Sequence, residues 1–252
     1  EDGDLLDPSA WRQSRPVTPF HAFAPEHALD YFGIPFFHGV EGWGPKQAYG
    51  PVGRAQAHQA GWHEAHVMQI MDEAHYWHDP AGKTFHIFAR CENHLTNYAA
   101  LTKVVEDDEG EMIMSHETAP SGKKMVFIPM PGGQTKFHVV YDPVTRLYWL
   151  ASTQAQDSMT RVEKLPPERF LLPYNERDRL QLSYSKNMVD WTFAGMIAVG
   201  ETAKHARHYC SMVIDGSDLH VLSRSGDGNN PNPHDTNLIT LHTVRDFRQL
   251  VY

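Results

Sequence analysis

The sequence predicts an all-β protein, a β-propeller of four-stranded antiparallel blades. Three turns led by aspartate recur along the chain, at Asp79-Pro80, Asp142-Pro143 and Asp215-Gly216. The aspartates lie 63 and 73 residues apart by subtraction, which is a period typical of propeller blades or repeat arrays. The segments that follow these turns are short and rich in β-branched and aromatic residues, which is the pattern of strands joined by tight turns.

The outer two copies of the repeat share further residues. His86 and Arg90 match His220 and Arg224, and Thr96-Asn97 matches Thr236-Asn237. Histidines at these mid-strand positions are expected to be packed. We interpret the repeat as the unit on which the whole fold is built.

Taken in order, the chain is expected to form one domain over residues 1–252, with three repeat units behind an irregular front segment. The front segment is 1–60, and the units are 61–130, 131–200 and 201–252. Units of about 65 residues give fewer than the four blades that a closed ring needs. We therefore expect residues 1–20 to form the outer strand of an incomplete front blade. A β-sandwich with irregular insertions is the alternative.

Each unit is predicted to contain about four strands. In the first unit they are 66–71, 84–90, 98–105 and a strand near 125–129. In the second they are 137–142, 147–152, 179–185 and 193–199. In the third they are 209–214, 219–223, 238–244 and a short closing strand. One short helix is predicted near 166–170.

Composition excludes several classes of protein. A hydrophobic fraction of 41% with six Trp, ten Tyr and twelve Phe is enough for a folded core. The net charge of -9 argues against a general nucleic-acid binder, and no apolar run reaches the roughly 20 residues of a membrane span. The two cysteines provide no disulfide framework.

Polar residues open the strand that is expected to be innermost in each unit. They are Glu64 and His66, Lys136 and His138, and His208. Alternate residues of a strand share a face, so Glu64 and His66 are expected to point the same way. The first residues of inner strands reach the mouth of a propeller channel, and a site is therefore expected there.

A second set of polar residues follows the second strands. Arg90 and Arg224 end those strands, and the loops beyond carry Asn97, His234-Asp235 and Asn237. An imidazole paired with a carboxylate makes a workable general base. A structural cap or a turn-forming Asp is the competing interpretation of each residue.

Cofactor and metal motifs are absent from the sequence. His63-Glu64-Ala65-His66 lacks the spacing of a zinc-protease helix, and His75 and His78 form an equally poor pair, so no metal is assigned although seven His lie between His58 and His94. No P-loop, nucleophile elbow or dinucleotide fingerprint is present.

With these residues in view, the chain resembles the bacterial sialidase-like, BNR-type β-propeller proteins among carbohydrate-active enzymes. Four segments carry the resemblance: Trp62 to Glu64, PGGQTKFHVVYDPVTRLYWLAS, SYSKNMVDWTF, and the C-terminal SRSGD with HDTNLITLHTVRDFR. SYSKNMVDW looks like a degenerate Asp box. The resemblance covers about residue 5 to the end. The chain departs from sialidases in lacking an intact Asp box, an early arginine motif and a recognisable Tyr/Glu nucleophile pair.

The resemblance implies a propeller that acts on a glycan, in a secreted or periplasmic protein. Our leading hypothesis is an enzyme that cleaves a glycosidic bond of an acidic glycan, and no cofactor is expected. Glu64 would be the acid or base, assisted by His234 or Asp235, and His66 is a further catalytic candidate. Arg90, Arg224 and Lys136 would hold a sugar carboxylate, because guanidinium groups pair with carboxylates through two hydrogen bonds. The remaining substrate-binding candidates are Asn97, His208 and Asn237.

Two alternatives stay open. The first is a polysaccharide lyase in which His66, His208 or Tyr209 removes the proton beside a uronate carboxylate that Lys or Arg neutralises. The second is a propeller that binds a glycan without cleaving it. Neither nucleic acid nor a membrane span is expected among the partners.

Overall fold

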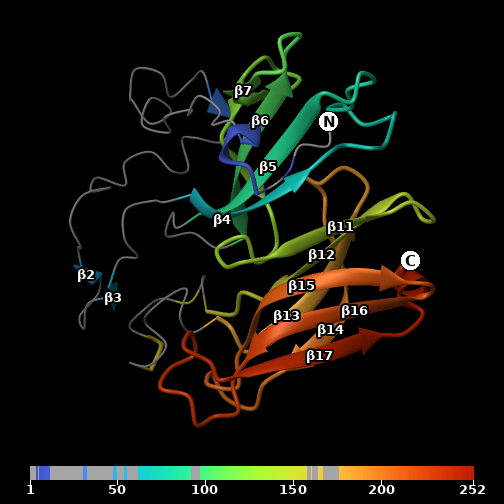
Figure 1. Cartoon of the computed structure of the whole chain (residues 1–252). Coiled ribbons are helices and arrows are strands. Elements are labelled where there is room, and N and C mark those ends of the chain that lie inside the picture. Colours follow the sequence, from blue (N-terminus) through green and yellow to red (C-terminus); the bar gives the residue numbers. More distant parts are fainter. Residues whose placement is uncertain are drawn as a thin grey trace. The chain divides into compact units, whose positions relative to one another are not determined.

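The computed structural model describes residues 4, 6–11, 31–32, 48–49, 54–55, 62–91, 97–157, 160, 164–166 and 176–252. These residues form strands, turns and short 3-10 segments, and no α-helix (Figure 1). In particular, no described helix is long and apolar enough to cross a lipid bilayer. The all-β prediction is therefore confirmed for the described part of the chain.

Three antiparallel sheets carry most of the structure. The first has the order β10-β6-β5-β4 with β7 beside β6, the second β11-β12-β13-β14, and the third β15-β16-β17. The strands of the first sheet are β4 (Trp62–Met68), β5 (Thr84–Cys91), β6 (Tyr98–Glu106), β7 (Met112–Ser115) and β10 (Phe127–Pro129). Those of the second are β11 (His138–Asp142), β12 (Leu147–Thr153), β13 (Arg179–Ser185) and β14 (Thr192–Val199). Those of the third are β15 (Arg207–Asp215), β16 (Asp218–Ser225) and β17 (Leu238–Val244).

The remaining strands are two residues long. In one small sheet, β1 (Tyr31–Phe32) pairs in parallel with β9 (Lys124–Met125), which pairs with β8 (Glu117–Thr118). In the other, β2 (Ala48–Tyr49) pairs with β3 (Arg54–Ala55).

The three aspartate turns occupy the same place in three different sheets. Asp79 lies before β5, Asp142 ends β11 and Asp215 ends β15, so each turn joins the first strand of a sheet to the second. The Asp79 carboxylate accepts hydrogen bonds from Thr84 Oγ1 at 2.8 Å and from the Ala81 backbone N–H at 2.9 Å. The three turns therefore lie in three different sheets, as predicted, but the described sheets have five, four and three strands where four each were predicted.

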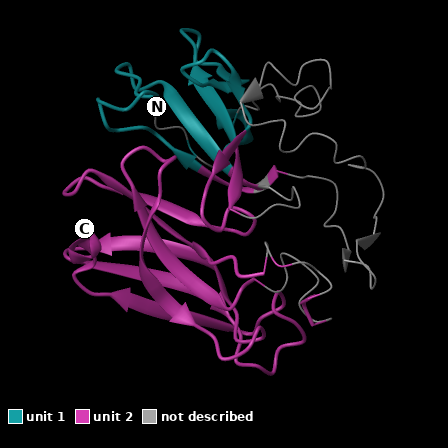
Figure 2. Ribbon diagram, turned by 180° about the vertical axis from the view of Figure 1, so that it is seen from behind, with its two compact units in different colours: residues 1–38, 67–88, 101–126 teal, residues 39–66, 89–100, 127–252 magenta. Residues whose placement is uncertain are grey.

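The chain divides into two compact units (Figure 2). Unit 1 comprises residues 1–38, 67–88 and 101–126, and its buried side chains include Ile70, Trp77 and Phe88. Unit 2 comprises residues 39–66, 89–100 and 127–252. Its core joins Trp149 and Leu180 of the second sheet to residues of the third, such as Val221.

Several predicted elements differ from those observed. The first strand begins at Trp62 rather than at residue 66. The closing strand is wrong, because Phe247–Leu250 is a 3-10 turn that buries Phe247 against Trp149, at a ring-centroid distance of 4.9 Å. The third sheet has three described strands where four were predicted. The expected helix at 166–170 and the outer strand at 1–20 lie largely outside the described residues; Pro8–Ala10 forms a short 3-10 segment.

Candidate functional site

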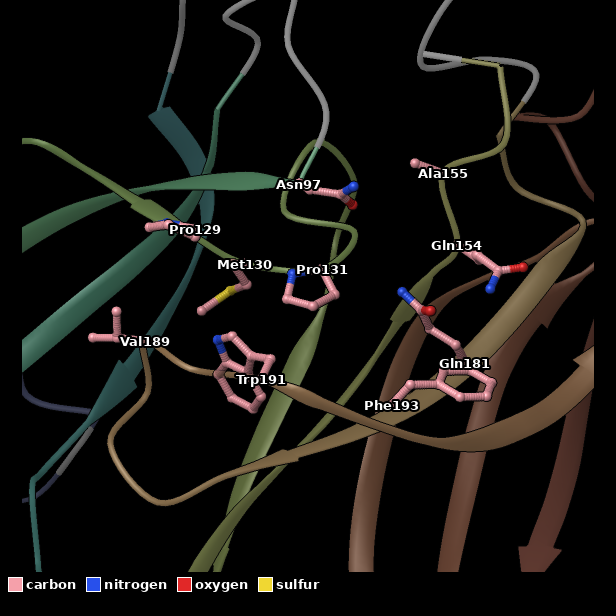
Figure 3. Close-up of a pocket in the computed structure, with 10 residues that line it drawn as sticks. All are labelled: Asn97, Pro129, Met130, Pro131, Gln154, Ala155, Gln181, Val189, Trp191 and Phe193. Carbon is pink, nitrogen blue, oxygen red and sulfur yellow. The ribbon is translucent and has the colours of Figure 1, made fainter. Parts of the chain in front are cut away.

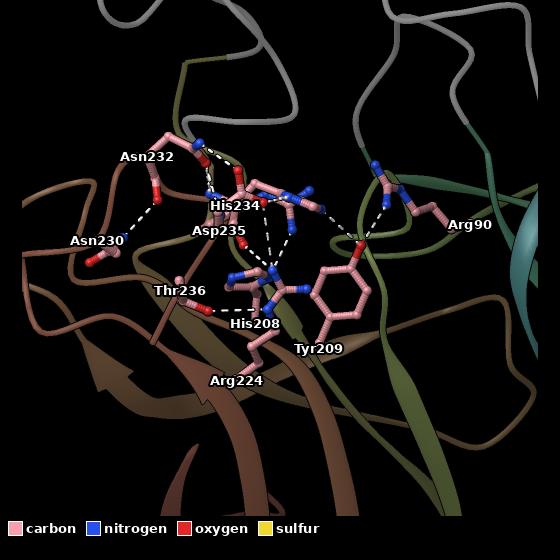
Figure 4. Close-up of polar contacts among 10 residues, drawn as sticks. Arg90, His208, Tyr209, Arg224, Asn230, Asn232, His234, Asp235 and Thr236 are labelled. Atoms are coloured by element: carbon pink, nitrogen blue, oxygen red, sulfur yellow. Dashed lines mark hydrogen bonds and ion pairs between the residues drawn. The ribbon is translucent and has the colours of Figure 1, made fainter. Parts of the chain in front are cut away.

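Tyr209 is the centre of a polar group in unit 2 (Figure 4). It lies in β15 with φ +48, where the pairing of β15 with β16 shifts register between His208 and Ser211. A bulky residue rarely adopts positive φ, and such strain is concentrated at functional sites. The phenol oxygen accepts a hydrogen bond from Arg90 Nη1 at 3.3 Å and lies 3.3 Å from His234 Nε2.

Glu64 and Arg90 meet beside this phenol. Glu64, within β4, also has a left-handed backbone conformation, with φ +55. Arg90, near the end of β5, is 5% exposed, and its Nη1 donates to Glu64 Oε2 at 3.2 Å while its Nε donates to the Gln134 carbonyl at 3.0 Å. One guanidinium therefore fixes a carboxylate and a phenol next to each other.

His234 and Asp235 belong to the loop between β16 and β17. His234 provides the second contact of the Tyr209 phenol oxygen. His234 Nδ1 donates to Asp235 Oδ1 at 2.7 Å, which leaves Nε2 as the acceptor facing Tyr209. Asn232 Oδ1 accepts from the backbone N–H groups of both residues at 2.8 Å. Hydrogen bonds from Asn232 and His234 lower the pKa of the Asp235 carboxyl. The Asp235 carboxylate therefore orients the His234 imidazole, as a carboxylate orients a general base in many enzymes.

Two further arginines lie over the Tyr209 ring. Arg224 Cζ is 5.0 Å and Arg177 Cζ is 5.6 Å from the ring centroid, within the range of cation–π attraction. Arg224 also donates to Thr236 Oγ1 at 3.2 Å and to the His234 carbonyl. Arg177 is 1% exposed, and burial, followed by repulsion from Arg90, lowers its pKa to about 10. Arg224 Nη2 also lies 3.9 Å from Asp235 Oδ1, so Arg90 and Arg224 each lie near one carboxylate.

His208 lies beneath this group. His208 is fully buried, and its Nδ1 accepts a hydrogen bond from Arg177 Nη1 at 2.8 Å. Burial, then the charges of Arg177 and Arg224, lower the pKa of His208 to about 2. The imidazole is therefore neutral in ordinary buffers and suits a positioning role rather than proton donation.

Tyr209 itself is a protonated phenol near neutral pH. Burial raises its pKa first, and the hydrogen bond with Glu64 raises it further against the opposing charges of Arg177 and Arg90. The phenol can therefore donate a proton as it stands, or act as a nucleophile once a neighbouring base removes that proton.

The structure brings together a large part of the predicted site residues. Glu64, Arg90, Arg224, His234 and Asp235 meet around Tyr209, with His208 beside them at a ring distance of 4.9 Å from Tyr209. Sequence reasoning named Tyr209 only in the lyase alternative and did not include Arg177. Arg177 belongs to the charged run 176–179, a pattern typical of an exposed loop, yet Glu176 and Arg177 are both fully or almost fully buried. The sequence contains no signal for that burial.

Lys136 and His66 form a different group. The His66 ring packs on His138 at 4.7 Å between centroids, and Lys136 Nζ donates to the Phe137 carbonyl at 2.8 Å. Burial, followed by the charge of Lys136, lowers the pKa of His66 to about 4. Glu64 and His66 were predicted to point the same way because alternate residues of a regular strand share a face. The positive φ of Glu64 breaks that regular geometry, and the two side chains contact different residues.

The two predicted asparagines have structural partners. Asn97 Oδ1 accepts from the Gly132 N–H at 3.0 Å, and the Asn97 N–H donates to Gln134 Oε1 at 3.0 Å. Asn237 Nδ2 donates to Asp227 Oδ1 at 3.0 Å and so closes the loop that carries His234. Among the described residues, no group of three or more His, Cys, Asp or Glu side chains is placed to hold a metal ion.

Comparisons with known proteins give distant likenesses. No protein-family model matches the chain, and no curated protein matches it. Similar solved structures include a fructofuranosidase from Schwanniomyces occidentalis with fructose (TM-score 0.42, 10% identity, 77% of this chain and 34% of that one). A second is a GH43 β-1,3-galactosidase with galactodeoxynojirimycin (TM-score 0.35, 12% identity, 73% of this chain and 41% of that one). A third is a mutant Trypanosoma rangeli sialidase displaying trans-sialidase activity (TM-score 0.36, 15% identity, 67% of this chain and 22% of that one).

The chain spans less than half the length of each of these three structures. At such TM-scores and identities, the likeness carries no conclusion about activity.

Proposed function

We propose that this protein is a carbohydrate-active enzyme that hydrolyses a glycosidic bond in an acidic glycan. The observation that carries the proposal is the environment of Tyr209. This residue has a left-handed backbone conformation, and its phenol lies beside a carboxylate and a histidine with three arginines around it. Arginine pairs with carboxylates through parallel hydrogen bonds. The group therefore suits a sugar carboxylate next to a proton-transfer centre, in a protein whose net charge is -9.

In this proposal Tyr209 is the nucleophile. Its oxygen bonds to the anomeric carbon as its proton passes to Glu64, and His234 in its protonated form gives a proton to the leaving oxygen as the glycosidic bond breaks. Water then attacks the anomeric carbon while neutral His234 takes a proton from that water. The bond between the anomeric carbon and the Tyr209 oxygen breaks, and Glu64 returns the first proton to the departing phenolate. Two successive displacements predict retention of anomeric configuration.

A second reaction is favoured by one contact. The 3.3 Å separation of Tyr209 Oη and His234 Nε2 sets a proton donor and a base side by side, as an elimination from one face of a uronate requires. His234 would take the proton beside the carboxylate that the arginines neutralise, and Tyr209 would protonate the leaving oxygen. The product is an unsaturated sugar.

The test is incubation with a panel of uronate- and sialate-containing polysaccharides. New reducing ends without the ultraviolet absorbance of an unsaturated sugar support hydrolysis, and reducing ends with that absorbance support elimination. Binding without cleavage, or no binding, rejects both enzymatic proposals. Tyr209→Phe and Glu64→Gln should each lower turnover by about 10²-fold or more. Tyr76→Phe, which removes a hydroxyl from a 65% exposed ring, is the matched control.

We also propose that the three antiparallel sheets are propeller blades. The proposal is supported by the equivalent positions of the Asp79, Asp142 and Asp215 turns in three sheets. A crystal structure of the protein tests it: radially arranged sheets are the expected result, and two sheets packed face to face as a sandwich contradict it.

A further inference from the structure

Unit 2 contains a pocket of about 460 Å³ whose lining carries no charge (Figure 3). A volume of this size falls within the range of small-molecule sites. Its ten lining residues are aromatic, aliphatic or amide-bearing, and none is Asp, Glu, Lys, Arg or His. This lining contrasts with the three arginines and two carboxylates around Tyr209, so the pocket suits an uncharged ligand.

Two aromatic side chains form one side of the pocket. Trp191 immediately precedes β14 and Phe193 is its second residue, so the two are separated by one residue and share a face of the strand. Phe193 is 44% exposed. Trp191 is only partly exposed. Aromatic rings that line a pocket provide apolar surface, and the C–H face of a pyranose packs on such a ring while its hydroxyl groups remain free for hydrogen bonds.

The polar atoms of the pocket are those that bind hydroxyl groups. Gln181 is 5% exposed and uses Nε2 to donate to Ser152 Oγ at 3.3 Å, while no partner among the described residues is found for its Oε1. Trp191 Nε1 is a buried donor without a hydrogen-bond partner in the described structure. Gln154 and Asn97 add two further carboxamides. A hydroxyl both donates and accepts, so it can satisfy either kind of atom.

A single residue connects this pocket with the arginine group. Gln134 Oε1 accepts from the backbone N–H of Asn97, which lines the pocket, and the Gln134 carbonyl accepts from Arg90 Nε, both at 3.0 Å. All these residues belong to unit 2. Asn97, which lines the pocket, is therefore linked to Arg90 of the Tyr209 group through Gln134.

We infer that the pocket is a subsite for a neutral sugar, stacked on Trp191 and Phe193 and held by the carboxamides of Gln154 and Gln181. Its place as a neighbour of the cleavage site rests on the proposed function, whereas neutral-sugar binding does not. The substrate class is then a mixed glycan, in which an uncharged residue adjoins the acidic one.

The experiment titrates the whole protein with uncharged disaccharides (lactose, cellobiose, xylobiose and maltose) by isothermal calorimetry and saturation-transfer NMR. At least one should bind, and Phe193→Ala and Trp191→Ala should each weaken it by about fivefold or more, because aromatic contacts of this kind contribute roughly 1 kcal/mol. Trp11→Ala removes a 65% exposed tryptophan outside the pocket and should leave binding unchanged. Since Phe193 is largely exposed, Phe193→Ala keeps the test valid if Trp191→Ala unfolds.

Each outcome decides one question. Failure of every disaccharide to bind the wild-type protein, or equal binding by Phe193→Ala, overturns the subsite. Tyr209→Phe separates this result from the proposed function, because it should lower cleavage of the acidic glycan by about 10²-fold or more and leave disaccharide binding unchanged. Disaccharide binding in a protein that cleaves no acidic glycan would reject the proposed function alone.

Discussion

Arg248 holds the carboxylate of Asp142 through two hydrogen bonds, from Nε to Oδ2 at 2.8 Å and from Nη2 to Oδ1 at 2.9 Å. Asp142 is fully buried, and Arg248 also donates to the Gly216 carbonyl at 2.8 Å. The C-terminal 3-10 turn is thus tied to two of the three aspartate turns. Charge-assisted pairs of this parallel geometry are stronger than neutral hydrogen bonds.

Arg248→Ala should lower the free energy of unfolding by about 3 kcal/mol, because it leaves a buried carboxylate without its cation. Urea denaturation measures the change. Arg245→Ala, an exposed arginine three residues earlier, is the control and should change stability by less than about 0.5 kcal/mol. Equal stabilities of the two variants would show that the Asp142 pair is energetically unimportant.

The same pair predicts an acid dependence. Burial raises the pKa of Asp142, but hydrogen bonds from Arg248 and Thr145 outweigh it and lower the pKa from 3.8 to about 2. A lowered folded-state pKa contributes stability that is complete above the unfolded-state pKa and is lost as pH falls through the folded value. The stability difference between wild type and Arg248→Ala should therefore shrink between about pH 4 and pH 2. A constant difference over that window contradicts the assignment.

Gly132 is required by both conformation and space. Its φ is +72, and a Cβ atom there would lie 2.4 Å from the Thr153 carbonyl oxygen and 2.6 Å from Ser152 Cβ. Gly132→Ala should therefore destabilise the protein by about 2 kcal/mol or more. Gly195→Ala is the control, because a Cβ at Gly195 in β14 meets no atom within 4 Å. Thermal unfolding of both variants tests the expectation, and equal melting temperatures contradict it.

The lowered pKa of His138 predicts that the protein loses stability at mildly acidic pH. Burial, then the charges of His66 and Lys136, lower its pKa from 6.5 to about 4. Because the folded-state pKa is the lower one, the stability that neutral His138 contributes is complete above pH 6.5 and is lost as pH falls towards 4.

Stability measured by urea denaturation at several pH values should therefore fall from pH 6.5 to about 4, and less steeply in His138→Asn. Asparagine keeps an acceptor for the Met212 N–H, which lies 3.3 Å from His138 Nδ1. His220→Asn replaces a partly exposed histidine that contacts Thr243 and should keep the wild-type slope. An unchanged slope in His138→Asn would reject His138 as the source.

The sequence predicted strand bounds well where turn-forming residues stand at both ends of an apolar or β-branched run. The strands at Arg179–Ser185 and Leu238–Val244 have the predicted bounds, because apolar or β-branched runs there are bounded by turn-forming residues. Phe247–Leu250 was misassigned because its apolar residues suit either a strand or a turn that buries one ring. Tertiary packing of Phe247 on Trp149 decided between them.

The candidate site could be predicted only in part. The repeat indicated Arg90 and Arg224, since both end the second strand of a unit, and these arginines meet around Tyr209. The left-handed conformations of Glu64 and Tyr209 have no sequence signal, because neither residue is a glycine or asparagine. Those two conformations place the carboxylate and the phenol on the same guanidinium, so the chemistry depends on geometry that the pattern does not contain.

Arg90→Lys is the sharpest test of the arginine at the centre of the site. Arg90 donates at the same time to Glu64 Oε2, Tyr209 Oη and the Gln134 carbonyl. Lysine keeps the positive charge but is a compact point donor without the planar fork, so it cannot hold all three acceptors in this geometry. We expect kcat/KM on the acidic glycan to fall by about 10²-fold.

The size of that decrease distinguishes positioning from charge alone. If positive charge were all that the site requires, Arg90→Lys would retain activity within a few-fold of wild type, and the proposed arrangement of Glu64 and Tyr209 would be wrong. Arg245→Lys, at an exposed position, controls for a general effect of the substitution. Circular dichroism and urea denaturation confirm that both variants are folded. Because Gln134 also contacts Asn97, binding of the neutral disaccharide should weaken slightly in Arg90→Lys, and far less than turnover.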